Sequence, residues 1–214
     1  MKKMQKNVWV LVLFQAFFFI SSQSVAQSLS EAKTSILIVG DSLSAGYGIK
    51  VEQTWPSLLQ NHFDQLGKNI KVHNASISGQ TSAEGAAQIL KLLQLTEPDL
   101  VVLELGANDG LRGLSVAEMK KNLADIIQSS QKAGAKVLLL GMHVPQNYGK
   151  RYSRMFHSAF QQLAEEHKTG LVPFMLETVA TQPKLIQPDG LHPTAEAQPI
   201  ILEYLLSRIE SSAE

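Results

Sequence analysis

Short apolar segments alternate with amphipathic segments from Thr34 to the end of the chain, and this alternation restricts the possible fold most. Five segments are predicted to be strands: Ser35–Val39, Lys71–Asn74, Asp99–Leu105, Ala135–Met142 and Gly170–Phe174. Runs such as Leu100-Val101-Val102-Leu103 are apolar without alternation. That pattern is typical of strands covered on both faces, as in a parallel sheet.

Helical patterns fill the intervals between the predicted strands. Thr81-x-x-Glu84 and Ser115-x-x-Glu118 have the spacing of capping boxes, and Gly134 stands where the second of these helices should end. Further helices are predicted over residues 52–66, 151–168 and 195–211. Strands alternating with helices predict an α/β fold with a five-stranded parallel sheet. In such sheets, functional sites gather in the loops after the carboxyl ends of the strands.

The first 26 residues have the features of a secretory signal peptide. Lys2, Lys3 and Lys6 precede an apolar run over 8–20, and Ser24 and Ala26 supply small residues before the expected cleavage site. An uncleaved membrane anchor is the alternative, but the run is shorter than the roughly 20 residues of a spanning helix. We therefore expect cleavage after Ala26, a folded domain over 27–214, and a periplasmic or secreted protein without stable membrane insertion.

Composition excludes several classes of function. The chain has 19 basic and 19 acidic residues, and without residues 1–26 the balance is 16 against 19, a net charge of −3. This lacks the basic surplus of a nucleic-acid-binding protein. The absence of cysteine from the sequence excludes a disulfide framework, a thiolate metal site and a cysteine nucleophile. The length fits one domain, which we expect to be a monomer.

Polar residues with complementary chemistry occur in four of the loops at this edge of the predicted sheet. Ser42 follows the first strand on a tight turn that can present its hydroxyl, with Asp41 expected to hydrogen-bond the turn. Gly79 can bring a backbone N–H close to a ligand, and Asn108 can point its side-chain amide into the same space. Each fragment alone also fits ordinary turn chemistry, but together they supply a nucleophile and donors for an oxyanion.

The fourth loop contains Asp189-x-x-His192, a spacing that lets the carboxylate hold the imidazole. This pair could orient a general base, or it could be half of a metal site. A metallohydrolase using Asp41, Asp109, Asp189 and His192 is therefore an open alternative. Three other histidines, His62, His157 and His167, are interpreted as solvated helix residues.

Together these fragments resemble the four sequence blocks of the SGNH (GDSL-type) hydrolase family. The matching residues are Gly40-Asp41-Ser42-Leu43-Ser44, Gly79, Gly106-x-Asn108-Asp109 and Asp189-x-x-His192. The resemblance implies a three-layer α/β/α flavodoxin-like fold and a serine hydrolase without metal or other cofactor. It implies Ser42 as the nucleophile, His192 as the general base and Asp189 as the group that orients the base. Ser42, Gly79 and Asn108 would form the oxyanion hole.

Longer stretches, at 40–48, 74–79, 108–113, 147–152 and 189–198, resemble secreted Gram-negative enzymes that hydrolyse acyl-CoA thioesters, aryl esters and lysophospholipids. This implies small acyl esters, thioesters or lysophospholipids as substrates. The resemblance implies that Leu111, Met142, His143, Val144 and Pro145 line the acyl groove. Alternatively, Met142 and Pro145 simply end the fourth strand. At position 143 this subgroup can have an arginine, whereas this sequence has His143. An esterase for acetylated carbohydrates is an alternative, as is a ligand-binding module without catalysis.

Overall fold

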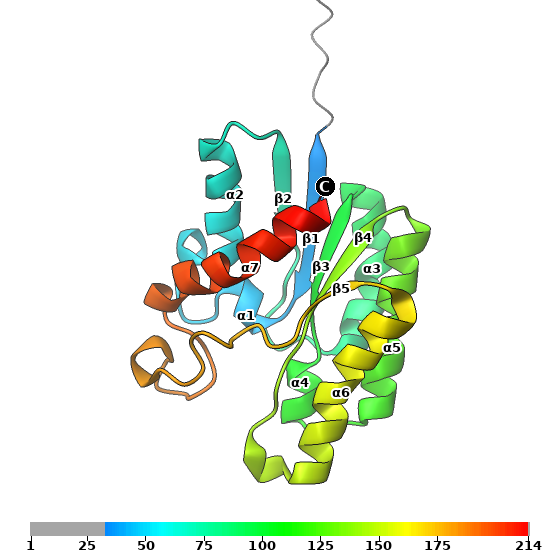
Figure 1. Cartoon of the computed structure of the whole chain (residues 1–214), viewed down its shortest axis with the longest axis vertical. Helices are drawn as coiled ribbons and strands as arrows, with labels where there is room; N and C mark the ends of the chain where they lie inside the picture. Colours follow the sequence, from blue (N-terminus) through cyan, green and yellow to red (C-terminus); the bar gives the residue numbers. More distant parts are fainter. Residues whose placement is uncertain (1–32, 214) are drawn as a thin grey trace, which may run out of the picture. The chain divides into compact units, whose positions relative to one another are not determined.

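The computed structural model describes residues 33–213, which form a five-stranded parallel sheet covered by helices (Figure 1). The strands are β1 Thr34–Gly40, β2 Ile70–Asn74, β3 Leu100–Glu104, β4 Lys136–Leu140 and β5 Gly170–Val172. Their order in the sheet is β2-β1-β3-β4-β5, and every neighbouring pair is parallel. This is the flavodoxin-like order, so the predicted fold is confirmed.

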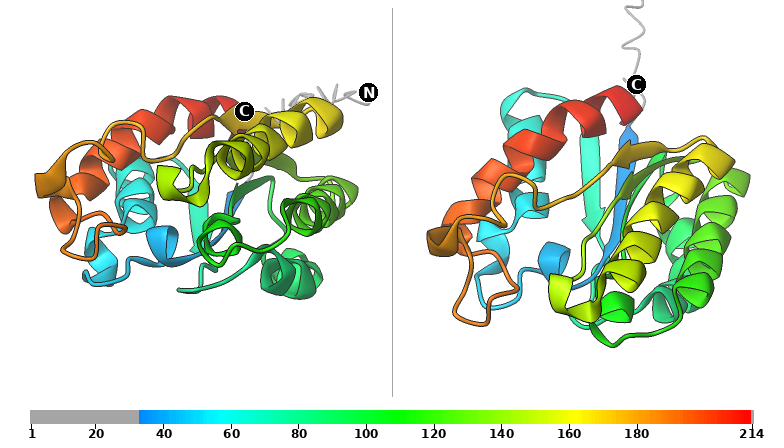
Figure 2. Two further views of the ribbon diagram at one scale, coloured as in Figure 1. Left: turned by 90° about the horizontal axis from the view of Figure 1, so that it is seen from below. Right: turned by 60° about the horizontal axis from the view of Figure 1, so that its bottom comes forward.

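Helices cover the sheet on both faces, which accounts for the uninterrupted apolar strands. The long helices are α2 Trp55–Gln65, α3 Ser82–Thr96, α5 Val116–Lys132, α6 Lys150–His167 and α7 Gln198–Ala213. Helices α2 and α7 pack together on one face, and α3, α5 and α6 lie side by side on the other (Figures 1 and 2). All five residues of β3 are buried between these two layers.

Short helices occupy the loops between these elements. Two are α-helical, α1 Ser42–Ala45 and α4 Ala107–Leu111. The 3₁₀ turns are η1 Val51–Gln53, η2 Gln146–Tyr148, η3 Pro183–Leu185 and η4 Ala195–Ala197. Helices α1 and α4 both lie at the edge where β1 and β3 end, the edge seen from below in Figure 2.

Capping hydrogen bonds explain where two helices begin. The hydroxyl of Thr81 accepts the N–H of Glu84, whose carboxylate accepts the N–H of Thr81 at 2.7 Å, so the predicted capping box before α3 is confirmed. At Ser115 only one of the two hydrogen bonds of the predicted capping box forms: the hydroxyl accepts the N–H of Glu118. Gly134 follows α5 with a φ of 92°, the left-handed conformation predicted for it.

Strands β4 and β5 are shorter than the sequence predicts. Pro173 has no N–H to donate to a sheet ladder, and β5 ends directly before it. Beyond the ladder, the N–H of Met175 still donates to the carbonyl of Gly141 at 3.0 Å. Met142 and Phe174, both predicted as strand residues, consequently lie in loops beyond the sheet.

The predicted signal peptide lies outside the described residues. Within residues 33–213, no helix is both long enough and apolar enough to cross a membrane.

Candidate active site

Ser42 is the first residue of α1 and lies directly beyond the end of β1. Its helix is capped by Asp41, whose Oδ1 accepts the N–H of Leu43 at 3.1 Å, as predicted for this turn. The helix has only four residues and ends at Gly46, which has a φ of 80°. The turn therefore presents the Ser42 side chain at the carboxyl edge of the sheet, next to the point where the strand order reverses.

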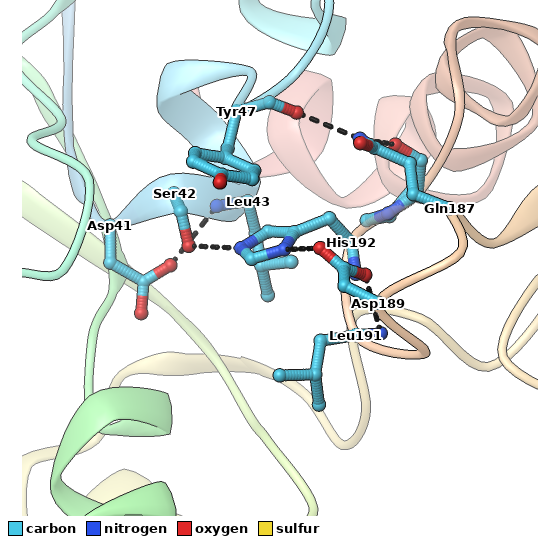
Figure 3. Close-up of polar contacts among 9 residues, drawn as sticks. Asp41, Ser42, Leu43, Tyr47, Gln187, Asp189, Leu191 and His192 are labelled. Carbon is cyan, nitrogen blue, oxygen red and sulfur yellow. Dashed lines mark hydrogen bonds and ion pairs between the residues drawn. The ribbon is translucent and has the colours of Figure 1, made fainter.

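The side chains of Ser42, His192 and Asp189 form a hydrogen-bonded chain (Figure 3). The Oγ of Ser42 lies 2.8 Å from Nε2 of His192, and Nδ1 of His192 lies 2.7 Å from Oδ2 of Asp189. The other carboxylate oxygen of Asp189 accepts the backbone N–H groups of Leu191 and His192. The predicted three-residue spacing thus lets one carboxylate bind both the backbone and the imidazole of the histidine.

A short antiparallel bridge between Ile186 and Pro193 closes the loop that carries Asp189 and His192. Gln187 reinforces it, because its N–H donates to the carbonyl of His192 at 2.7 Å. The side-chain amide of Gln187 also donates to the carbonyl of Tyr47 at 2.7 Å, joining this loop to the segment after α1. The loop is therefore fixed both internally and to the turn that carries Ser42.

Tyr47 packs against the imidazole of His192, with ring centroids 4.5 Å apart and planes inclined by 36°. Its side chain stays largely open, with 54% of the residue exposed. Figure 3 shows the ring above the Ser42–His192 hydrogen bond. Sequence reasoning missed this residue, since a tyrosine in a Gly-rich turn gives no signal of its own.

Asn108 and Gly79 lie beside the same cavity as Ser42. The side-chain nitrogen of Asn108 donates to Oδ2 of Asp41 at 2.9 Å and to the carbonyl of Gln80 at 3.1 Å. Asn108 belongs to the short helix α4, where the sequence predicts a loop. Gly79 has a φ of 82°, a backbone conformation that residues other than glycine rarely adopt.

Burial and hydrogen bonding shift the acidic groups of the site in opposite directions. The backbone N–H of His192, together with that of Leu191 and the His192 ring, lowers the pKa of Asp189 to about 2. Burial raises the pKa of Asp41 to about 6, although its bonds from Leu43 and Asn108 act against the rise. Asp189 therefore keeps its negative charge beside the imidazole at neutral pH.

A cavity of about 820 Å³ opens beside Ser42 and His192. The five predicted groove residues all line it: Leu111, Met142, His143, Val144 and Pro145. The segment between β5 and the His192 loop adds further apolar lining that sequence reasoning missed: Phe174, Leu176, Ala180, Pro183 and Ile186. The cavity thus joins a polar end at Ser42 to a predominantly apolar channel.

His157 corrects one interpretation made from the sequence. It is half-buried rather than solvated, as are His62 and His167, and its ring packs edge-on against His143 at 4.2 Å between centroids. His143 also stacks on Phe174 at 4.4 Å. Burial lowers the pKa of His143, and the neighbouring His157 lowers it further. This position is therefore an aromatic wall of the cavity, and it gives no sign of a fixed positive charge for an anionic headgroup.

The four side chains of the alternative metal site do not converge on one point, although Asp189 and His192 are in contact. Asp109 points to the start of α3, where its carboxylate accepts the N–H and the hydroxyl of Ser82 at 2.8 and 2.6 Å. Among residues 33–213, no group of three or more histidine, aspartate and glutamate side chains is placed to hold an ion. The geometry favours the serine arrangement over the metallohydrolase.

Residues 38–199 match the model of the GDSL-like Lipase/Acylhydrolase family. The chain belongs to this family. Both the family and the reaction class predicted from the sequence, hydrolysis of acyl esters, are thereby confirmed.

Several known proteins are similar to this chain over most of their length. An arylesterase of Vibrio mimicus is 46% identical over 84% of this chain and 90% of its own length. The thioesterase 1/protease 1/lysophospholipase L1 of Escherichia coli (strain K12) is 40% identical over 84% of this chain and 85% of its own. The esterase EstA from Pseudoalteromonas sp., solved inhibited by monoethylphosphonate, superimposes with a TM-score of 0.81 at 43% identity, covering 83% of this chain and 97% of EstA.

Proposed function

We propose that this GDSL hydrolase cleaves acyl esters, acyl thioesters and lysophospholipids through an acyl-enzyme formed on Ser42. One observation carries the proposal: the Ser42–His192–Asp189 chain lies at the mouth of a mainly apolar cavity. A serine hydroxyl is a weak nucleophile at neutral pH and needs an adjacent base. His192 lies 2.8 Å from the hydroxyl, close enough to accept its proton directly.

The reaction proceeds in two halves. As the Oγ of Ser42 attacks the acyl carbon, its proton passes to Nε2 of His192, and the imidazolium is stabilised by the carboxylate of Asp189. When the bond to the leaving group breaks, His192 returns that proton to the departing alkoxide or thiolate. Water then attacks the acyl-enzyme with the same proton transfers, which releases the acid and restores Ser42.

We assign the oxyanion hole to the backbone N–H groups of Ser42 and Gly79 and to the side-chain amide of Asn108. Both hydrogens of that amide already bind, to Asp41 and to Gln80. Asn108 therefore reaches the oxyanion only by sharing one hydrogen between two acceptors. We expect its contribution to lie near the lower end of the range of about 2.7–4 kcal/mol for one such donor.

The nature of the cavity supports lipid-like substrates over acetylated carbohydrates. Each buried CH₂ contributes about 0.8 kcal/mol, so a channel walled by Val144, Leu176 and Ile186 rewards a longer acyl chain. A sugar would instead need polar groups along the same walls. The relatives named for arylesterase, thioesterase and lysophospholipase activity agree with this choice.

The test is labelling by a serine-directed phosphonate, followed by peptide mapping and assay of a Ser42→Ala variant. We expect one label per chain on Ser42 and no ester hydrolysis by the folded variant. A comparison of p-nitrophenyl esters of increasing acyl length with acyl-CoA, lysophospholipid and acetylated xylan then defines the substrate class. Activity retained by the Ser42→Ala variant excludes the mechanism, and a preference for acetylated xylan excludes the lipid-like class.

The composition of residues 1–26 supports export with cleavage after Ala26. We propose that the mature hydrolase is a periplasmic or secreted monomer over residues 27–214. N-terminal sequencing of protein recovered outside the cytoplasm should begin at Gln27, and light scattering should give the mass of one chain. Recovery of the protein from the membrane fraction with its first 26 residues still attached would contradict the predicted cleavage.

A further inference from the structure

Glu104 is a buried acid that the proposed mechanism does not use. It is the last residue of β3, has no exposed surface, and follows four apolar residues in the strand. The polar groups that act on its carboxyl are Asp41 and Ser44, neither of which is a cation. A buried acid without a cationic partner is costly to the fold, so its presence at the catalytic edge requires a reason.

The carboxyl of Glu104 holds the nucleophile turn on both sides of Ser42. Its Oε2 accepts the backbone N–H of Asp41 at 3.1 Å and the hydroxyl of Ser44 at 2.7 Å. Both donors are fully buried, so water does not replace these bonds easily. Ser44 is tied again from β2, because its carbonyl accepts the side-chain amide of Asn74 at 2.9 Å. Glu104 thus fixes the turn through Asp41 and Ser44.

The same network reaches the oxyanion hole through Asp41. Oδ1 of Asp41 accepts the N–H of Leu43, and Oδ2 accepts the side-chain amide of Asn108 at 2.9 Å. Glu104 fixes the backbone of Asp41, and Asp41 fixes Asn108. The nucleophile and one oxyanion donor are therefore held by a single chain of buried hydrogen bonds.

Burial opposes a negative charge on both of these neighbouring carboxyls at once. Burial, and then the charge of Asp41, raises the pKa of Glu104 well above its usual range. Asp41 receives two N–H donors and is better able to carry the charge. The raised pKa favours the neutral form of Glu104, and a glutamine can reproduce both the shape and the acceptor oxygen of that form.

We propose that Glu104 is a positioning residue for acyl transfer: its hydrogen bonds to Asp41 and Ser44 hold Ser42 and Asn108 at the distance that the reaction requires. The proposal rests on the assignment of Ser42 and Asn108 under the proposed function. Misplacement of a reacting group by about 1 Å can cost roughly 100-fold in rate, which sets the scale of the expected effect.

Two variants of the full chain test the proposal with a p-nitrophenyl ester. Glu104→Met keeps the length of the side chain and removes the oxygen that accepts both hydrogen bonds. We expect kcat to fall about 30- to 100-fold with KM unchanged. Glu104→Gln should keep kcat within about threefold because its amide oxygen still accepts both bonds. A merely structural role predicts no such split between kcat and KM. Wild-type kcat in Glu104→Met, or an equal loss in Glu104→Gln, overturns the proposal.

Loss of stability is controlled by Leu93→Ala, which opens a cavity under α3 away from the site and should leave kcat unchanged. Should Glu104→Met fail to fold, Ser44→Ala removes one of the two bonds and should lower kcat about tenfold at constant KM. An unchanged kcat in Ser44→Ala then rejects the proposal.

Phosphonate labelling separates the two proposals from each other. If wild-type protein is not labelled on Ser42, the proposed function itself fails. If Ser42 is labelled and the Glu104→Met variant reacts at the wild-type rate, the function stands and the role of Glu104 is wrong. The expected result is labelling of the same residue in both proteins, slower in the variant.

Discussion

Gly40 and Glu104 are register partners on β1 and β3, and the glutamate carboxyl occupies the space above the glycine. A Cβ on Gly40 would lie 2.6 Å from Oε2 of Glu104 and 2.9 Å from the hydroxyl of Ser76. The absence of a side chain at position 40 therefore lets a buried acid reach the turn that carries Ser42.

Gly40→Ala should consequently impair both stability and catalysis. We expect about 1–3 kcal/mol of destabilisation from overpacking, and a fall of about tenfold or more in kcat as Glu104 is displaced. Urea unfolding and ester hydrolysis measure the two effects. Gly170→Ala is the matched control. Gly170 begins β5, and a Cβ there would be equally crowded, at 2.9 Å from the side chain of Leu138. That variant should lose stability alone, and equal losses of kcat in both variants contradict the prediction.

Asn108→Ala should lower kcat about 100-fold with little change in KM, because the amide acts mainly when the oxyanion forms. The shared hydrogen bonds to Asp41 and Gln80 place the effect near this lower value of the usual range. Asn122→Ala provides the comparison, since it removes an amide that donates to Ser82 away from Ser42. An Asn108→Ala enzyme with wild-type kcat removes this residue from the oxyanion hole.

Asp189→Asn should lower kcat by roughly 1,000- to 10,000-fold, because an amide favours the wrong tautomer of His192. It should also change how stability depends on pH. The folded-state pKa of Asp189 is lowered to about 2. Its contribution is therefore complete above the ordinary aspartate pKa near 4 and disappears as the pH falls towards 2.

Urea unfolding of wild type and Asp189→Asn at several pH values between 2.5 and 6 measures this dependence. The stability advantage of the wild type should be larger at pH 6 than at pH 2.5. A constant difference across this range would mean that Asp189 makes no charge-dependent contribution to folding.

The Tyr47 ring should help to hold the imidazole of His192. An aromatic contact of this kind contributes about 0.5–1.5 kcal/mol, so Tyr47→Ala should lower kcat roughly 3- to 10-fold. Tyr47→Phe keeps the ring and should stay within about twofold of wild type. Because the hydroxyl has no part in this role, a loss in Tyr47→Phe as large as in Tyr47→Ala would assign the effect to the hydroxyl instead.

The sequence was sufficient to predict the sheet, the long helices and the set of polar residues at its edge. Apolar runs without alternation required a doubly covered parallel sheet, and topology then brought Ser42 and Asn108 to one edge. Asp189 and His192 were predictable as a pair because only two residues separate them. Their meeting with Ser42 depends on the path of the chain after β5, which no local pattern specifies.

What sequence reasoning missed depends on contacts between distant segments. The wall formed by Phe174, Leu176 and Ile186 comes from a stretch without regular periodicity. His157 packs against His143 of the cavity wall only because α6 lies beside that segment. Glu104 did carry a signal, since an acid ending a run of four apolar strand residues is seldom accidental. Its partners, Asp41 and Ser44, could be identified only from the structure.

Phe174 should determine how strongly the hydrolase favours long acyl chains. It lines the cavity and stacks on His143. Burial of a large apolar side chain contributes about 1.5–3 kcal/mol, and Phe174 is only half-buried. Phe174→Ala should therefore lower the ratio of kcat/KM for p-nitrophenyl octanoate to that for the acetate about tenfold, with the acetate rate nearly unchanged.

The ratio isolates the acyl channel because both esters share the leaving group and the same Ser42 chemistry. Leu90→Ala supplies the matched control, since Leu90 is an apolar side chain 64% exposed on α3 and away from the cavity. An equal loss for both esters in Phe174→Ala would mean that the ring supports the catalytic geometry through His143. An unchanged ratio would mean that the acyl chain follows another path from Ser42, and the walls at 142–145 would then be the next to test.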